Sequence, residues 1–259
     1  MSLLGKIRLW MAYNIHLGFH PQPKRVLFAW LERQTGMRVA QGPFRGMKLV
    51  NAAFGSSLMP KMVGTYELEI QQDIEDLLGN NYHYFMDIGA AEGYYAIGMA
   101  MRFAARETKT LAYDIASESA VAVKQAADSN GVLGKIEIRD LCRHSDFEIA
   151  KTGQTLVICD IEGAEKELLD PDVGPGLRLC DIVVEVHDGP SGHDIRNLLL
   201  KRFRNSHHII QRFAAPRHSR DLGSLSWKLP QKLALSLMNE GRNFGIEWLV
   251  MKTKRVSID

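Results

Sequence analysis

The chain has 259 residues, of which 46% are hydrophobic and 24% charged, as is typical of a globular protein with a domain-sized core. Its formal net charge of +2 argues against a nucleic-acid partner, because neutralising phosphates needs clustered surplus Lys and Arg. Cys142, Cys159 and Cys180 are odd in number and far apart. They indicate neither a disulfide framework nor a Cys-x-x-Cys metal site, and they favour a reducing, cytoplasmic compartment.

Residues 1–20 predict an amphipathic helix whose uninterrupted apolar run is too short to span a membrane. Lys6, Arg8 and His16 interrupt the apolar run, while the leucines and isoleucines gather on one side. Such a helix commonly packs on its own domain. The alternative is a peripheral contact with a membrane surface.

Two further elements are expected before residue 80. Residues 37–50 predict a hairpin that turns at the sequence GPFRG. Residues 65–80 predict an amphipathic helix that Gly79 and Asn80 end. Residues 1–80 are therefore expected to form a helical and hairpin cap.

Strand and helix patterns alternate from residue 81 onward. Each strand ends on or next to an acid or a histidine, and Ser117 is expected to cap the second helix, with Ser191 and Asp194 forming a capping box at the last. This order predicts an α/β fold with a doubly wound, Rossmann-like sheet. The expected strands are 82–88, 110–115, 135–140, 155–160 and 181–187, and the expected helices are 94–106, 116–129, 144–151, 163–170 and 191–204.

The end of the chain predicts two more strands, which bring the sheet to seven. Residues 207–214 and 244–253 are both strand-like, and a helix near 229–239 lies between them. They fit an antiparallel pair at one sheet edge. Residues 81–259 are thus expected to form the main domain, with an insertion at 214–238.

The loop that follows the first strand of this domain has the sequence DIGAAEG. A dinucleotide site favours Gly-x-Gly-x-x-Gly, but the frame that starts at Gly89 continues with Ala91 and the bulky Tyr94. Asp87 and Glu92 flank the place where phosphates would lie. Acids at this place favour a cationic ligand. A plain strand-to-helix turn is the alternative for the loop taken alone.

S-adenosylmethionine is a cationic ligand that fits this loop. It carries an ammonium and a sulfonium, and small loop residues allow its close approach. Asp114 ends the second strand 21 positions after Gly93, near the usual offset of a ribose-binding acid. Asp140 ends the third strand, where it is expected to meet the adenine amino group. The loop is therefore interpreted as that of a class I methyltransferase.

With these features the sequence resembles the FkbM-type methyltransferases, class I enzymes that act mainly on hydroxyl groups of sugars and other natural products. The resemblance covers residues 64–252 and leaves residues 1–60 and the insertion unplaced. The matching segments are GTYELE (64–69), DIGAAEGYYAI (87–97), DIEGAEKELL (160–169), VEVH (184–187) and the tail NEGRNFGIEWLV.

The resemblance also implies site residues. It implies that the DIEG sequence, with Asp160 and Glu162, faces the reacting methyl group. It implies that Glu67 reaches the methionine end of the cofactor, and that the remaining cofactor residues are Asp87, Gly89, Ala90, Gly93 and Asp114.

Methyl transfer to a hydroxyl needs help with the proton, because an aliphatic hydroxyl is a weak acid. His187 ends an apolar strand and is the first candidate for a general base, with Asp160 and Glu162 as further catalytic candidates. The alternative is a histidine that caps a helix or bonds the backbone. Asp160 and His187, joined by Glu162 or Asp188, also suit a divalent metal such as Mg²⁺, although acids at sheet ends also cap helices.

Five polar or aromatic residues are candidates for binding the acceptor. Glu240 and Arg242 could bond a polyol or pair with each other. Trp227 could stack on a sugar ring or anchor the insertion. The full set is Asp188, His193, Trp227, Glu240 and Arg242.

The sequence thus predicts an S-adenosylmethionine-dependent O-methyltransferase that acts on a hydroxylated small molecule, in particular a carbohydrate or glycoconjugate. One alternative is a methyltransferase of nitrogen or of RNA. The balanced charge and the lack of an Asn-Pro-Pro-Tyr type loop count against it. The other alternative is a non-catalytic, metabolite-binding domain of the same fold.

Overall fold

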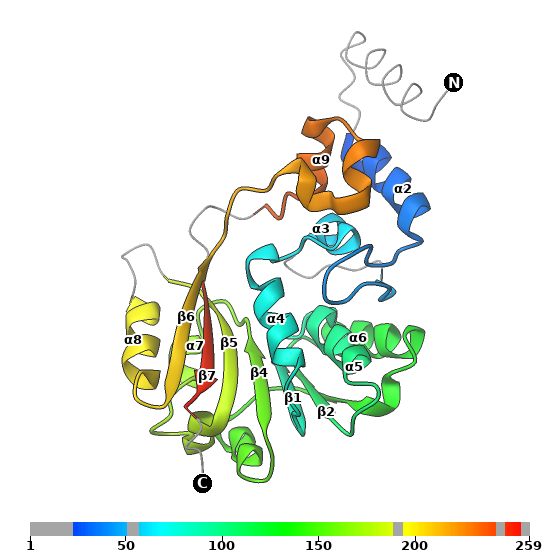
Figure 1. Cartoon of the computed structure of the whole chain (residues 1–259). Helices are drawn as coiled ribbons and strands as arrows, with labels where there is room; N and C mark the ends of the chain where they lie inside the picture. Colours follow the sequence, from blue (N-terminus) through cyan, green and yellow to red (C-terminus); the bar gives the residue numbers. More distant parts are fainter. Residues whose placement is uncertain (1–22, 51–56, 189–193, 242–246, 255–259) are drawn as a thin grey trace, which may run out of the picture.

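The computed structural model describes residues 23–50, 57–188, 194–241 and 247–254. The described residues form a seven-stranded sheet in the order β3-β2-β1-β4-β5-β7-β6 (Figure 1). β7 is antiparallel to both of its neighbours, and the other pairings are parallel. This confirms the predicted Rossmann-like sheet. Its strands are β1 (Tyr84–Ile88), β2 (Lys109–Tyr113), β3 (Ile136–Arg139), β4 (Thr155–Cys159), β5 (Cys180–Val186), β6 (His207–Phe213) and β7 (Glu247–Thr253).

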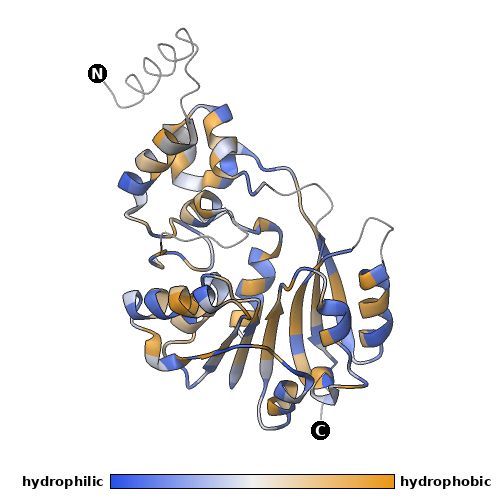
Figure 2. Ribbon diagram, turned by 180° about the vertical axis from the view of Figure 1, so that it is seen from behind, coloured by the Kyte–Doolittle hydropathy of each residue, from blue (hydrophilic) through white to orange (hydrophobic). Residues whose placement is uncertain are grey.

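Both faces of the sheet are covered, which explains why its central strands are apolar throughout. On one face α4 (Gln71–Leu78), α5 (Tyr94–Arg102) and α6 (Ser117–Ser129) contribute Ile74, Ala96 and Val123 to one core cluster. The other face of the sheet is covered by elements that contribute to a second core cluster. These elements are η3 (His144–Lys151), α7 (Glu165–Leu168), η4 (Pro175–Leu179) and α8 (Asp194–Phe203). Figure 2 shows the hydrophobic residues of the strands in orange. The buried cysteines Cys142, Cys159 and Cys180 are unpaired.

Several helix boundaries differ from the expected ones. The expected helix 65–80 begins only at Gln71, because Glu67 is left-handed (φ 49) and a 3₁₀ turn, η1 (Leu68–Ile70), follows it. Ser117 is the first residue of α6 and does not cap it. The backbone N–H of Ala116 instead donates to Asp114. The segment 144–151 is a 3₁₀ helix.

Four of the described helices, which come from segments far apart in sequence, pack together, and this group is called the cap from here on. α2 (Pro23–Thr35) and α3 (Leu58–Val63) pack with η5 (Ser219–Lys228) and α9 (Gln231–Leu237) of the insertion. They share one apolar cluster, which includes Leu31, Met62, Leu222 and Leu237. Because β6 runs parallel to β1 to β5, the insertion leaves the sheet at the edge where those strands end, so the cap lies beside that edge (Figure 1).

The segments between α2 and β1 link the cap to the sheet. The expected hairpin at 37–50 has a single antiparallel bridge, Arg38 to Lys48, among its described residues. Its Phe44 and Met47 belong to the cluster that covers the sheet, as does Ile70 of η1. The division into a cap of residues 1–80 and a main domain of residues 81–259 stays a prediction.

The described helices include none that is both long and apolar enough to cross a bilayer. The expected amphipathic helix of residues 1–20, with its expected membrane contact, lies outside the described residues, and so does Ser191 of the expected capping box.

Candidate active site

A cavity of about 430 Å³ opens at the carboxyl ends of β1 to β4, which is the size of a small-molecule site at the edge where open α/β sheets bind ligands. Five of the predicted site residues line it: Gly89, Asp114, Asp140, Asp160 and Glu162. Among the described residues, the charged side chains of the lining are four carboxylates, and no Lys, Arg or His belongs to it. The cavity therefore favours a ligand that carries positive charge.

The loop after β1 passes close to the loop after β4. Gly89 has φ 86, and a Cβ atom on it would lie 1.8 Å from the backbone oxygen of Asp160. Only glycine fits this crossing. The glycine therefore serves the contact between two loops, and its expected role in close approach to the ligand stays a prediction.

Asp114 holds this loop in place. Its Oδ2 accepts a hydrogen bond from the N–H of Ala91 at 2.7 Å, and its Oδ1 accepts one from Ala116 at 2.8 Å. Ala91 has φ 48, which is uncommon for a residue with a side chain. Because backbone strain of this kind gathers at functional sites, it supports a role for the loop beyond connecting two elements. Sequence analysis missed Ala91 and the buried Ser119, whose hydroxyl donates a hydrogen bond to the carbonyl oxygen of Ala91.

Asp87 lies beneath the cavity and does not line it. It is buried, and its Oδ2 accepts a hydrogen bond from the N–H of Ala96 in the first turn of α5 at 2.7 Å. Burial and the neighbouring charges of Asp160 and Asp114 together raise the pKa of Asp87 to about 7, against the hydrogen bond from Ala96 and the charge of Lys61. Asp87 thus fixes the helix that begins beside the cavity.

The other expected cofactor residues also lie outside the cavity lining. Gly93 is the left-handed N-cap of α5, and Ala90 is buried in the core cluster. Glu67 is buried and accepts a hydrogen bond from the hydroxyl of Tyr95. Glu92, which was expected to face the ligand, forms a buried ion pair with Lys61. Nothing in the sequence near Glu92 indicates Lys61, which lies on α3.

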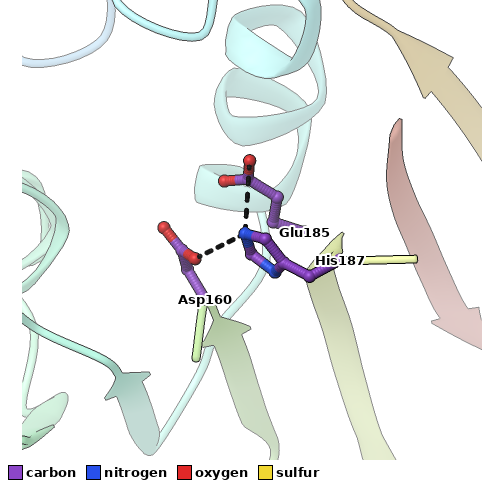
Figure 3. Close-up of side chains that lie close together, drawn as sticks. All are labelled: Asp160, Glu185 and His187. Carbon is purple, nitrogen blue, oxygen red and sulfur yellow. Dashed lines mark ion pairs between the residues drawn. The ribbon is translucent and has the colours of Figure 1, made fainter. Parts of the chain in front are cut away.

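His187 lies at the centre of a cluster of carboxylates just after β5. Its Nδ1 donates a hydrogen bond to Oε1 of Glu165 at 2.8 Å. Its Nε2 lies 3.5 Å from Asp160, 3.6 Å from Glu162 and 3.7 Å from Glu185. Figure 3 shows Asp160 and Glu185 on the same side of the imidazole.

These carboxylates determine the protonation of His187. Burial alone would lower its pKa, but the hydrogen bond to Glu165 and the charges of Glu165, Asp160 and Glu185 raise it to about 9. The ring is therefore protonated at neutral pH and, in this state, cannot accept a proton. Sequence analysis missed Glu165 and Glu185. The alternation of side chains on a strand, which places Glu185 on the face of His187, was the signal that could have found the second.

The expected acceptor residues have mixed outcomes. Oδ1 of Asp188 accepts hydrogen bonds from the N–H groups of Ile195 and Arg196, at 2.8 and 3.2 Å. Asp188 thus caps the N-terminus of α8. Glu240 pairs with Arg217 at 2.7 Å. His193, Arg242 and the side chain of Trp227 lie outside the described part of the chain.

Arg217 is a further residue that sequence analysis missed. Its guanidinium joins two buried carboxylates of distant segments, Glu69 at 2.8 Å and Glu240 at 2.7 Å. Oε1 of Glu240 also accepts a hydrogen bond from the backbone N–H of Glu67 at 3.3 Å. Segments that are far apart in sequence, at residues 67–69, 217 and 240, therefore meet beside Glu67.

No family model matches this sequence, and no curated protein is similar to it at a significant level. The resemblance to FkbM-type enzymes is thus not confirmed. Solved methyltransferases share the architecture at low identity. An O-methyltransferase of tomaymycin synthesis from Streptomyces achromogenes, solved with S-adenosylmethionine, is 11% identical over 73% of this chain and 80% of that one, with a TM-score of 0.44.

Two further similar structures are named for RNA substrates. A tRNA (m1A22) methyltransferase from B. subtilis is 13% identical over 70% of this chain and 64% of that one, with a TM-score of 0.42. A protein from Clostridium thermocellum, provisionally named an rRNA methylase, is 8% identical over 71% and 95%, with a TM-score of 0.48. The expectation of no nucleic-acid partner is corrected by these findings, because the same architecture occurs in proteins named for RNA. A balanced net charge does not exclude a local basic surface.

Proposed function

We propose that the protein is an S-adenosylmethionine-dependent O-methyltransferase of a hydroxylated small molecule. The observation that carries this proposal is the cavity beyond β1 to β4, whose charged lining consists of Asp114, Asp140, Asp160 and Glu162. Four carboxylates repel the negatively charged pyrophosphate of a dinucleotide and attract the positively charged sulfonium and ammonium groups of S-adenosylmethionine. The loop after β1 contributes only the small residues Gly89 and Ala91 to the cavity lining.

The lining also offers places for the other parts of this cofactor. Ile115 and Leu141 are apolar side chains that are 82% and 49% exposed at the cavity, so that an adenine between them would cover surface that now faces water. We assign the ribose to Asp114 and the adenine amino group to Asp140. The methyl group would then point toward Asp160.

The reaction would be a displacement at the methyl carbon. The acceptor oxygen attacks, the bond from carbon to sulfur breaks, and S-adenosylhomocysteine leaves, while the hydroxyl proton passes to a base or to solvent. Asp160 joins the cavity lining to the cluster at His187, so the group that assists deprotonation would lie there. Either a basic side chain or a bound cation can supply this assistance.

The acceptor class is part of the proposal. A carbohydrate or glycoconjugate, as in the FkbM-type enzymes, would reach the cavity at the carboxyl ends of the strands, the side of the sheet on which the cap lies. Arg217 and Glu240 lie near Glu67 and could form hydrogen bonds with hydroxyl groups of the acceptor.

Calorimetry with S-adenosylmethionine and S-adenosylhomocysteine tests the cofactor. Asp114→Ala should weaken binding at least 10-fold, and Ile115→Ala should weaken it several-fold through lost apolar contact. Asp128→Asn, an exposed carboxyl on α6, is the matched control and should bind as the wild type does. Wild-type affinity in both site variants would refute the proposal.

Transfer of a labelled methyl group tests the acceptor. Cell extract divided into a low-molecular-weight fraction, glycoconjugates and total RNA should yield label in one of the first two. Label in RNA alone would refute the proposed acceptor class and leave the cofactor assignment intact.

A further inference from the structure

We propose that Asp160, Glu185 and His187 bind a divalent cation, Mg²⁺ or Mn²⁺, at the edge of the cavity, with Glu165 orienting the histidine. The ion site itself needs no assumption about function. Its role in deprotonating the acceptor rests on the proposed function.

The ligand atoms have a suitable spacing. Nε2 of His187 and one carboxylate oxygen each of Asp160 and Glu185 lie within 4.8 Å of one another. The distances from Nε2, 3.5 Å to Asp160 and 3.7 Å to Glu185, are long for hydrogen bonds. They are near the roughly 3.0–3.4 Å that separates neighbouring ligands of an ion with bonds of about 2.1–2.4 Å.

Glu165 supplies what a ligating histidine usually has, a carboxylate on its other nitrogen. It is fully buried, and its Oε1 accepts a hydrogen bond from Nδ1–H of His187 at 2.8 Å. With Nδ1 engaged, Nε2 is the nitrogen that faces Asp160 and Glu185 (Figure 3). The ring is thus held in the orientation in which its second nitrogen can coordinate, once the arriving cation has displaced the Nε2 proton to solvent.

The charge of the cluster favours a cation. Four carboxylates, those of Asp160, Glu162, Glu165 and Glu185, lie around one imidazole. A positively charged ring balances only one of these four carboxylates. Two of these acids, Glu165 and Glu185, are buried, where a bound cation would stabilise their charge.

Rigid elements hold the three proposed ligands. Asp160 follows β4, and Glu185 and His187 lie two residues apart at the end of β5, on the same side of the strand. In the register of these strands Cys159 pairs with Val184, so Asp160 and Glu185 follow next to each other. Oxygen ligands with one imidazole suit Mg²⁺ or Mn²⁺ better than a thiolate-seeking metal.

The position of the site suggests its use. Asp160 also lines the cavity and Glu162 is 82% exposed, so an ion there would be reached from the cavity and would keep positions open for an oxygen of the acceptor. A coordinated hydroxyl loses its proton more readily, because the ion stabilises the alkoxide. The cation would therefore replace His187 as the group that assists deprotonation.

Titration of the full-length protein with Mn²⁺, followed by electron paramagnetic resonance, tests the site directly. One Mn²⁺ per chain should bind with a dissociation constant below the millimolar range, and its spectrum should show coupling to one imidazole nitrogen. Glu185→Gln and His187→Gln should each weaken binding at least 10-fold, and His187→Gln should abolish the coupling. Glu165→Gln, which acts through the histidine, should weaken it about 10–100-fold.

Asp140→Asn is the matched control, since Asp140 lines the same cavity but lies outside the cluster. It should bind Mn²⁺ as the wild type does. Equal binding in all variants, or binding without nitrogen coupling, would overturn the site. Circular dichroism checks that each variant is folded.

The cofactor titration separates this inference from the proposed function. Mn²⁺ binding without S-adenosylmethionine binding would leave the ion site standing and refute the methyltransferase. Methyl transfer that proceeds equally with chelator and with Mg²⁺ would overturn the role of the ion and leave the enzyme standing.

Discussion

The carboxylates at the ends of the strands have different tasks, although the sequence presents them alike. Asp87 is buried and holds the first turn of α5. Asp114 holds the loop at Ala91 and also lines the cavity. Asp160 lies between the cavity and His187. Burial and hydrogen-bond partners, rather than residue type, decide which of these acids is available to a ligand.

The buried carboxyl of Asp87 should make stability depend on pH. Its pKa is about 7 in the folded protein, against 3.8 as an ordinary value. Between these values the folded chain keeps a proton that the unfolded chain has lost, so the free energy of unfolding should fall as pH rises from about 4 to 7, by at most roughly 1.4 kcal/mol per pH unit. Urea denaturation of the protein without ligand, at pH 5 and pH 7, measures this slope.

Asp87→Asn should flatten this slope, because the amide oxygen still accepts the bond from Ala96 but does not ionise. Asp128→Asn, on the surface of α6, should keep the wild-type slope. A slope that is the same in all three proteins would show that another group causes it.

At the scale of elements, close contacts between loops shape the site. The loops after β1 and β4 touch at Gly89 and Asp160, and a second contact of this kind joins η4 to η3, where a Cβ atom on Gly176 would lie 2.0 Å from the backbone oxygen of Phe147. Both glycines are needed for packing. Only the first contact lies at the cavity.

Gly89→Ala and Gly176→Ala form a matched pair. Each should lower the midpoint of thermal unfolding, because a backbone atom must move by an ångström or more to admit the methyl group. Gly89→Ala should in addition weaken S-adenosylmethionine at least 10-fold, whereas Gly176→Ala should leave that affinity within about 2-fold. Calorimetry on both folded variants decides between a local and a global effect, and equal losses of affinity would contradict the assignment of the cavity.

At the scale of the whole molecule, the cap unites the beginning of the described chain with the late insertion. Leu31 of α2, Met62 of α3 and Leu222 of η5 belong to one buried cluster. Each segment alone would expose its apolar side chains to water. The cap should therefore form and open as one unit.

Leu222→Ala tests this unit. A cavity in the cluster should lower the free energy of unfolding by about 2–5 kcal/mol. Hydrogen exchange should become faster in α2 and α3, which lie far from residue 222 in sequence. Leu199→Ala, in the cluster on the other side of the sheet, should leave exchange in α2 and α3 unchanged. Faster exchange confined to η5 would show that the insertion opens alone.

Local patterns of the sequence determined the alternation of strands and helices, the seven-stranded sheet and the position of the loop at Gly89, because side-chain periodicity and glycine turns act over a few residues. The same patterns placed Asp114, Asp140 and Asp160 at strand ends, where the cavity lies. They did not show that Asp87 faces a helix, nor that Ser117 begins a helix without capping it.

Only the tertiary structure decided which side chains meet. The pairing of Glu92 with Lys61 and of Glu240 with Arg217, and the carboxylates around His187, depend on strand register and on the packing of the cap. These contacts join residues that are far apart in the chain, and their geometry follows from the burial of large apolar clusters. A linear sequence records the residues of such a site, but the distances between them exist only once the clusters have formed.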